Sequence, residues 1–115
     1  MKPILIRPYQ PEDWPRIEAI HDSARKLELE LAGLSEAFVP LKLAADREGL
    51  FDYRLHVAVV DGIVTGFAAH SEDELAWLYV DPAHTRQGIG RALVQYALGQ
   101  MTARPVTIEV LQGNL

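Results

Sequence analysis

The sequence has 115 residues, of which 49% are hydrophobic and 23% are charged, and its formal net charge is −5. These values are ordinary for one globular domain, and the negative balance argues against a nucleic acid bound through its phosphates. The chain contains no cysteine, which excludes disulfides, thiolate zinc sites and a thiol nucleophile.

Longer-range patterns exclude further classes of protein. No apolar run approaches the roughly 18 residues that a membrane helix needs, and the N-terminus lacks the apolar core of a signal peptide. The four histidines do not show the paired spacing of metal ligands. We therefore expect a single cytoplasmic domain over residues 1–115, with no metal, no membrane segment and no nucleic-acid partner.

The first third of the chain predicts a strand and two helices. Residues 2–9 alternate around Ile4 and Ile6 and predict a strand. Pro11 then begins a helix that Gly33 ends. Its apolar stripe consists of Trp14, Ile17, Ile20, Ala24, Leu27 and Leu31. Residues 35–50 are less regular and predict a short second helix from residue 41 to residue 46.

Polar residues of the first helix are expected to face solvent. Arg16 and Asp22 lie on the face opposite the apolar stripe, which is most simply a solvated surface. His21 lies beside the stripe, and we expect it at the edge of the buried face rather than in catalysis.

The middle of the chain predicts three antiparallel strands. Residues 53–60 and 63–69 are apolar runs separated by Asp61-Gly62, which is a strong signal for a two-residue hairpin. Gly66 suggests a bulge in the second of these strands. Residues 75–80 form the next strand, residues 88–101 an amphipathic helix, and residues 106–111 a last strand.

The most informative stretch lies between the third of these strands and the helix. Arg86-Gln87-Gly88-Ile89-Gly90-Arg91 precedes the helical periodicity. The first N–H groups of a helix have no partner within it and favour a negative charge. Two arginines beside these groups make the stretch suitable for a diphosphate.

The two glycines are also compatible with other structures. A Gly-x-Gly before a helix can be only a tight turn. A Rossmann fingerprint would need a third glycine where Leu93 stands, and a Walker A loop would need Gly-Lys-Ser/Thr. A nucleotide-binding glycine loop of another kind remains open on these residues alone.

The stretch from Leu78 to Leu93 closely resembles the acyl-CoA signature of the GNAT family of N-acetyltransferases. The match comprises Val80-Asp81-Pro82 followed by Arg86 to Leu93, and it departs from the family pattern at Thr85. The resemblance implies an α+β fold, a three-layer sandwich with a mixed sheet of about five strands. In it an antiparallel meander precedes a parallel pair that is splayed around acyl-CoA.

The resemblance also implies which residues hold acetyl-CoA. Backbone groups of the third meander strand would pair with the pantetheine arm, and the glycine loop would bind the pyrophosphate. An asparagine five residues after Glu109 falls where many members contact CoA. The implied cofactor-binding residues are Leu78, Tyr79, Val80, Arg86, Gln87, Gly88, Ile89, Gly90, Arg91 and Asn114.

The activity implied is acetyl-CoA-dependent N-acetylation, with the acetyl group passing directly to an amine acceptor in a ternary complex. Glu109 is the first candidate for the general base, because some members use a glutamate at this position of the last strand. Glu74, which enters the third meander strand, is the second candidate. A carboxylate on a sheet is more often solvated or ion-paired, so both assignments compete with that interpretation.

The chain ends at Leu115, one residue after Asn114, whereas the family normally continues with another helix and a hairpin. An uncovered apolar strand at a sheet edge favours pairing with a second copy, so a homodimer is expected. The alternatives are a fragment of a longer acetyltransferase and a short, non-catalytic or weakly active module that binds acyl-CoA.

Overall fold

The computed structural model describes residues 2–101 and 107–108. Within them, four strands form an antiparallel sheet in the order β1-β2-β3-β4. The strands are β1 (Leu5–Pro8), β2 (Arg54–Val60), β3 (Ile63–His70) and β4 (Glu74–Val80). A two-residue segment, β5 (Thr107–Ile108), pairs in parallel with the first residues of β4. The strand predicted over residues 106–111 lies largely outside the described residues, so its full length stays a prediction.

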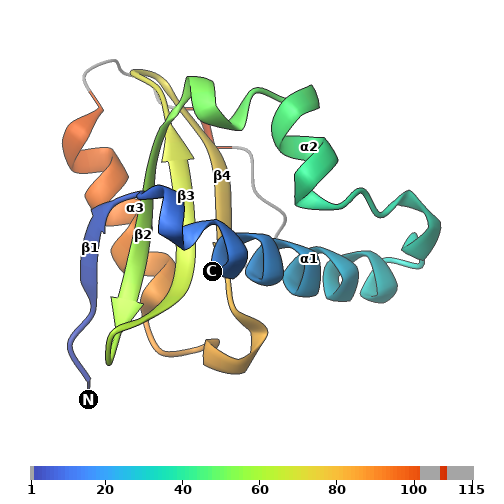
Figure 1. Cartoon of the computed structure of the whole chain (residues 1–115), viewed down its shortest axis with the longest axis horizontal. Coiled ribbons are helices and arrows are strands. Elements are labelled where there is room, and N and C mark those ends of the chain that lie inside the picture. The colour runs from blue at the N-terminus through green and yellow to red at the C-terminus, as the bar shows by residue number, and fades with distance from the viewer. Residues whose placement is uncertain (1, 102–106, 109–115) are drawn as a thin grey trace.

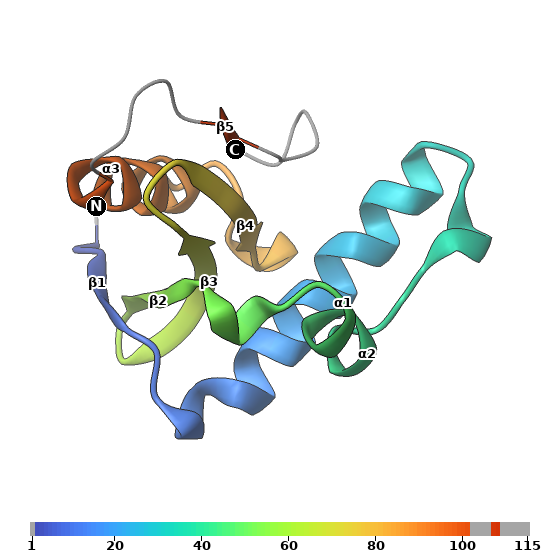
Figure 2. The same cartoon turned by 90° about the horizontal axis from the view of Figure 1, so that it is seen from above.

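Helices cover both faces of the sheet. The helices α1 (Trp14–Leu31) and α2 (Leu41–Arg47) lie on one side, and α3 (Ile89–Gln100) lies on the other, as Figure 1 and Figure 2 show. The predicted α+β class and three-layer arrangement are confirmed. None of the helices in the described part of the chain combines the length and apolar character needed to cross a bilayer.

Two apolar clusters, one on each face, hold the layers together. On the α1 face, Ile17 and Ile20 pack with Phe67 and Trp77 of the sheet. On the α3 face, Leu93 and its neighbours pack with residues of β2, β3 and β4. Burying each large side chain contributes roughly 1.5–3 kcal/mol, so the two clusters fix the sheet between its helices.

The hairpin between β2 and β3 is as predicted. Asp61 and Gly62 both have positive φ, 53° and 75°, the backbone of a type I′ turn whose twist matches that of the flanking strands. The β2–β3 register shifts beside Gly66, where Thr65 is the additional residue. The expected bulge therefore lies one residue before the glycine.

Gly66 itself permits a close approach of α3 to the sheet. A Cβ at this position would lie 3.0 Å from the carbonyl oxygen of Tyr79 and 3.1 Å from Cδ1 of Leu93. Such distances are shorter than ordinary carbon contacts. A side chain here would push α3, and the loop before it, away from the sheet.

The expectations for α1 need correction. Leu27 and Leu31 belong to the predicted apolar stripe, yet they are 45% and 81% exposed. The C-terminal half of α1 extends past the edge of the sheet (Figure 1), so no layer covers these residues. Conversely, His21 is 3% exposed and buried rather than at an edge.

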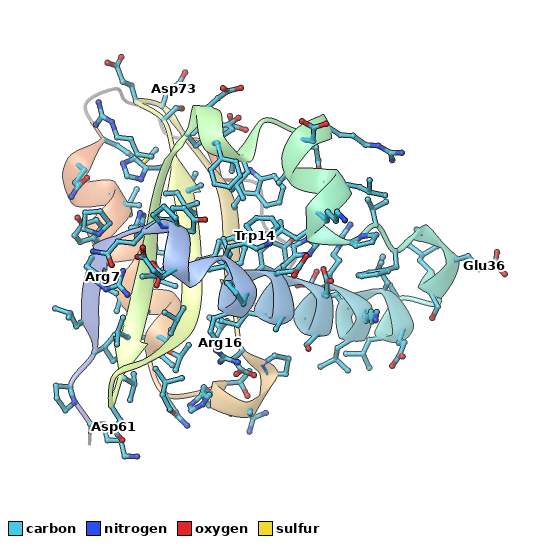
Figure 3. All side chains as sticks on the ribbon, in the orientation of Figure 1. Arg7, Trp14, Arg16, Glu36, Asp61 and Asp73 are labelled. Atoms are coloured by element: carbon cyan, nitrogen blue, oxygen red, sulfur yellow. The ribbon has the colours of Figure 1, made fainter. Side chains whose placement is uncertain are left out.

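The polar face of α1 is not simply solvated either. Arg16 Nη2 donates to the carbonyl oxygen of Val64 at 2.8 Å and to Asp81 Oδ2 at 3.0 Å. Figure 3 shows Arg16 reaching from α1 toward the turn that follows β4. Because hydrogen bonds to charged groups are stronger than neutral ones, this side chain ties α1 to the ends of β3 and β4.

Two histidines are buried beneath α3. His56 and His70 are 2% and 0% exposed, and their ring centroids lie 5.3 Å apart. Burial, reinforced by the neighbouring His70, lowers the pKa of His56 to about 4. Burial also lowers the pKa of His70. Both rings are therefore neutral in the folded protein near pH 7.

This burial predicts a loss of stability in mild acid. An unfolded histidine binds a proton below pH 6.5, whereas His56 resists protonation down to about pH 4. The stabilisation is complete above pH 6.5 and is lost as the pH falls toward 4. At pH 4.5 the contribution of His56 to the loss is roughly 2 to 3 kcal/mol.

Urea unfolding at pH 7 and at pH 4.5 measures this change. The variant His56→Leu lacks the ring and should lose less stability between the two values. Asp13 does not contribute in this window, because its hydrogen bonds with Arg7 lower its pKa below the ordinary 3.8. An identical pH dependence in wild type and His56→Leu would contradict the assignment.

Candidate functional site

The strand β4 has an irregularity at its centre. Leu75 pairs with His70, but the next pair is Trp77 with Ala69, so Ala76 is an extra residue without a partner in β3. The bulge places Ala76 and Trp77 together on the α1 side, while Leu75 and Leu78 pack on the α3 side. A bulge also increases local twist and re-aims the strand that carries it.

The described pairing between β4 and β5 is confined to Glu74 and Leu75. Beyond this point, the strand runs from the bulge to Val80 along the same edge. An extended ligand can add to such an edge as a further strand. The role predicted for the backbone of Leu78, Tyr79 and Val80 stays a prediction.

A cavity of about 680 Å³ opens on the α1 side of β4. Its floor is Glu74 and residues 76–79 of β4, and its walls come from α1, α2 and the segment before β2. Small-molecule sites typically have volumes of roughly 300–1,000 Å³. The cavity therefore has room for a small molecule beside the bulge.

Glu74 lies at this floor and is held by an aromatic side chain. The Tyr53 hydroxyl donates a hydrogen bond to Glu74 Oε1 at 2.8 Å. Both residues line the cavity and are half-buried. The hydrogen bond orients the carboxylate while its second oxygen can accept a proton or a donor from a ligand.

On the opposite wall, His21 is oriented by its neighbour. Its Nδ1 lies 3.0 Å from Asp22 Oδ1, which also accepts a hydrogen bond from the backbone N–H of Leu41 at 2.9 Å. An ionised carboxylate only accepts, so this contact favours a proton on Nδ1. Burial lowers the pKa of His21 below its ordinary 6.5, despite the opposing effect of Asp22.

Tyr79 joins the two walls. Its ring makes an edge contact with His21 at 4.7 Å between centroids and stacks on Phe67 at 5.6 Å. Burial raises the pKa of Tyr79 to about 12. The phenol is therefore neutral at physiological pH and is poorly suited to act as a base.

The glycine loop has the backbone that an anion site requires. Gly88 has φ +81° and immediately precedes α3, and Arg86 also lies in the left-handed region with φ 63°. The first helical bond runs from the N–H of Ala92 to the carbonyl of Gly88. The N–H groups of Ile89, Gly90 and Arg91 therefore have no acceptor within the helix.

The charges beside these amides suit a diphosphate. Arg86 and Arg91 are exposed, and neither takes part in the ion pairs found within residues 2–101. Gln87 is exposed between them, and no side chain or backbone atom crowds Gly88. The residues present thus fit the phosphates of the CoA that the sequence resemblance implies.

Two predicted site residues, Glu109 and Asn114, lie outside the described residues. Their predicted roles stay predictions. In the part that is described, no group of three or more histidine, aspartate or glutamate side chains is placed to hold a metal ion.

The sequence alone did not mark Tyr53, Arg25 or Arg47 as site residues, and it predicted His21 at the edge of the buried face of the first helix. Tyr53 lies 21 residues before its partner Glu74, at no spacing that marks a motif. Arg25 and Arg47 read as surface charges on short amphipathic stretches. Only the packing of α1 and α2 against β4 brings them to one cavity.

Comparisons with known proteins agree with this architecture. A family profile described as "Acetyltransferase (GNAT) domain" matches residues 51–114, more than half of the chain. A curated relative from Escherichia coli, "Uncharacterized N-acetyltransferase YafP", is 29% identical over 103 residues. The match covers 83% of this chain and 65% of that relative, so this chain spans slightly less than two thirds of the relative's length.

Solved structures show the same fold. The crystal structure of a "GCN5-Related N-acetyltransferase: Aminotransferase, Class-II" from Rhodopseudomonas palustris is 25% identical with a TM-score of 0.78. The match covers 97% of this chain and 76% of that one. A GNAT family acetyltransferase from Brucella melitensis, in complex with acetyl-CoA, is 22% identical with a TM-score of 0.69, over 98% of this chain and 79% of that one.

The profile match spans the hairpin, the bulged strand and the glycine loop, which are the elements that form the cavity floor and the anion site. With fold and sequence pointing to the same group, this chain belongs to the GNAT family of acetyltransferases.

Proposed function

We propose that the protein transfers an acetyl group from acetyl-CoA to the nitrogen of an amine, with both substrates bound at once. The observation that carries the proposal is the position of Glu74. It lies on the cavity floor two residues before the bulge, and its backbone pairs with Thr107 of β5. A carboxylate there lies beside the edge proposed to hold the acyl arm.

The cofactor side of the site rests on backbone groups. Leu78, Tyr79 and Val80 present the strand edge for the pantetheine arm, and the amides that open α3 bind the phosphates. Arg86 and Arg91 add positive charge beside these amides, in a chain whose net charge is −5. When bound, acetyl-CoA supplies the acetyl group as a thioester.

The acceptor side supplies proton transfer. In a transfer that forms a C–N bond and breaks the C–S bond of the thioester, Glu74 would accept the proton that the amine loses and would pass it on, directly or through water, to the leaving thiolate, so that no net proton is gained or lost. Tyr53 keeps Glu74 Oε1 engaged, so the other oxygen faces the amine. The chain lacks cysteine, so no acyl-cysteine intermediate can form on it. The amine therefore attacks the thioester directly.

The glycine loop gives the first test of this function. Gly90 is the second residue of α3, and a branched side chain there occupies the space through which the diphosphate approaches the amides. Gly90 is buried, so Gly90→Val is also melted thermally, and it should abolish acetyl-CoA binding in isothermal titration calorimetry at a temperature at which the variant is still folded.

The matched control is Gly99→Val, at the other end of the same helix. Nothing lies within 4 Å of a Cβ at Gly99, so this variant should bind acetyl-CoA like the wild type. Equal affinity of the two variants would place the phosphates elsewhere.

The carboxylate gives the second test. Glu74→Gln keeps the hydrogen bond from Tyr53 but cannot take up a proton. Removing a general base typically lowers the rate roughly 10²- to 10⁴-fold. Thiol release from acetyl-CoA over a panel of amines measures kcat, which should fall in this range while acetyl-CoA affinity is retained.

Two further variants make this result specific. Asp73 lies at the tip of the turn before β4 (Figure 3), so Asp73→Asn should retain full activity. Glu109→Gln tests the first candidate base. A large loss in Glu109→Gln with full activity in Glu74→Gln would reject Glu74 as the base.

The same assays separate the alternative function, an acyl-CoA-binding module without transfer. Such a module would bind acetyl-CoA and release no thiol with any amine. The homodimer and the cytoplasmic location expected from the sequence stay predictions.

A further inference from the structure

The charged side chains that line the cavity are balanced in sign. Arg25 of α1 and Arg47, the last residue of α2, carry positive charge, while Glu48 and Glu74 carry negative charge. His21 adds no charge near pH 7, because burial lowers its pKa. A cavity with both signs on its walls complements a ligand that also carries both.

The two arginines have donors available for a ligand. Arg25 Nη1 donates to Glu28 Oε2 at 3.1 Å, the one hydrogen bond of this guanidinium group within residues 2–101. A guanidinium group carries five N–H donors. Arg47 is exposed at the cavity wall and forms no ion pair within the described part of the chain. A guanidinium group presents two parallel N–H donors that match the two oxygens of a carboxylate.

The positions of the charges give the ligand a direction. Glu74 lies on the floor beside the bulge, whereas Arg25 and Arg47 lie on the helices that form the walls. A ligand with its amine at Glu74 therefore extends an anionic group toward the helices. Because Glu48 also lines this end of the cavity and Glu28 pairs with Arg25, the preference for a carboxylate rests on the free N–H donors of the two guanidinium groups rather than on net charge.

We propose that the acceptor is a small amino acid-like molecule, an amine that also bears a carboxylate, with that carboxylate bound by Arg25 and Arg47. This assignment rests on the proposed function, because it takes the cavity as the acceptor site. The aromatic side chains of Tyr53, Trp77 and Tyr79 line the space between the two ends and suit an apolar spacer.

A matched set of acceptors tests the assignment. Phenylalanine carries the carboxylate, phenylalaninamide replaces it with a neutral amide, and 2-phenylethylamine lacks it. Hydrogen bonds to charged groups are worth about 1.5–3 kcal/mol, so kcat/KM for phenylalanine should exceed the other two by roughly 10- to 100-fold. Equal values for the three, or a preference for 2-phenylethylamine, would overturn the proposal.

The arginines are tested by Arg47→Gln, with Lys42→Gln as the control. Both substitutions remove one positive charge from α2, but Lys42 is exposed and does not line the cavity. Arg47→Gln should raise KM for phenylalanine and reduce its advantage over the amide, with KM for acetyl-CoA unchanged. Lys42→Gln should behave as wild type, and an undiminished preference in Arg47→Gln and in the double variant with Arg25→Gln would contradict the assignment.

A binding measurement distinguishes this proposal from the proposed function. Saturation-transfer NMR with the three compounds reports the binding of each without requiring turnover. Selective binding of phenylalanine, lost in Arg47→Gln, supports the carboxylate site even if no thiol is released, and in that case only the transferase function fails. Absence of selective binding in the wild type overturns the carboxylate site, whatever the activity.

Discussion

The arrangement of the whole site depends on one extra residue in β4. If Ala76 were paired regularly instead of bulged, side chains would alternate strictly along the strand, and Trp77 would face α3 with Leu75 instead of the cavity. The bulge gives the α1 side two consecutive residues and then returns Leu78 to the α3 core. One strand thereby serves two packed layers.

Two different contacts hold the helices α1 and α3 against the sheet. At the C-terminal end of β4, Arg16 links the turn after the strand to α1 through Val64 and Asp81. Close packing against Gly66 brings α3, and with it the glycine loop, onto the other face. The loop and the cavity therefore keep a fixed relation to each other through the core rather than through direct contact.

Much of this fold could be predicted from the sequence, because its signals are local. Asp61-Gly62 between two apolar runs specified the hairpin, and the periodicity after Gly90 specified α3. The buried face of α1 could be predicted for Ile17, Ile20 and Ala24, but its extent could not, since periodicity says which face is apolar and not where the sheet ends before Leu27 and Leu31. The glycine loop was recognisable as a contiguous motif, whereas the pairing of Tyr53 with Glu74 depends on residues brought together only by tertiary packing.

The hydrogen bond that the Asp22 carboxylate accepts determines how far the α2 wall of the cavity can vary. It holds α2 through the backbone N–H of Leu41 and not through any side chain of that helix. Exposed residues of α2 can therefore be exchanged in evolution or in the laboratory without losing its docking point. The wall that α2 gives to the cavity is therefore free to diversify, while the bulged strand and the glycine loop stay unchanged.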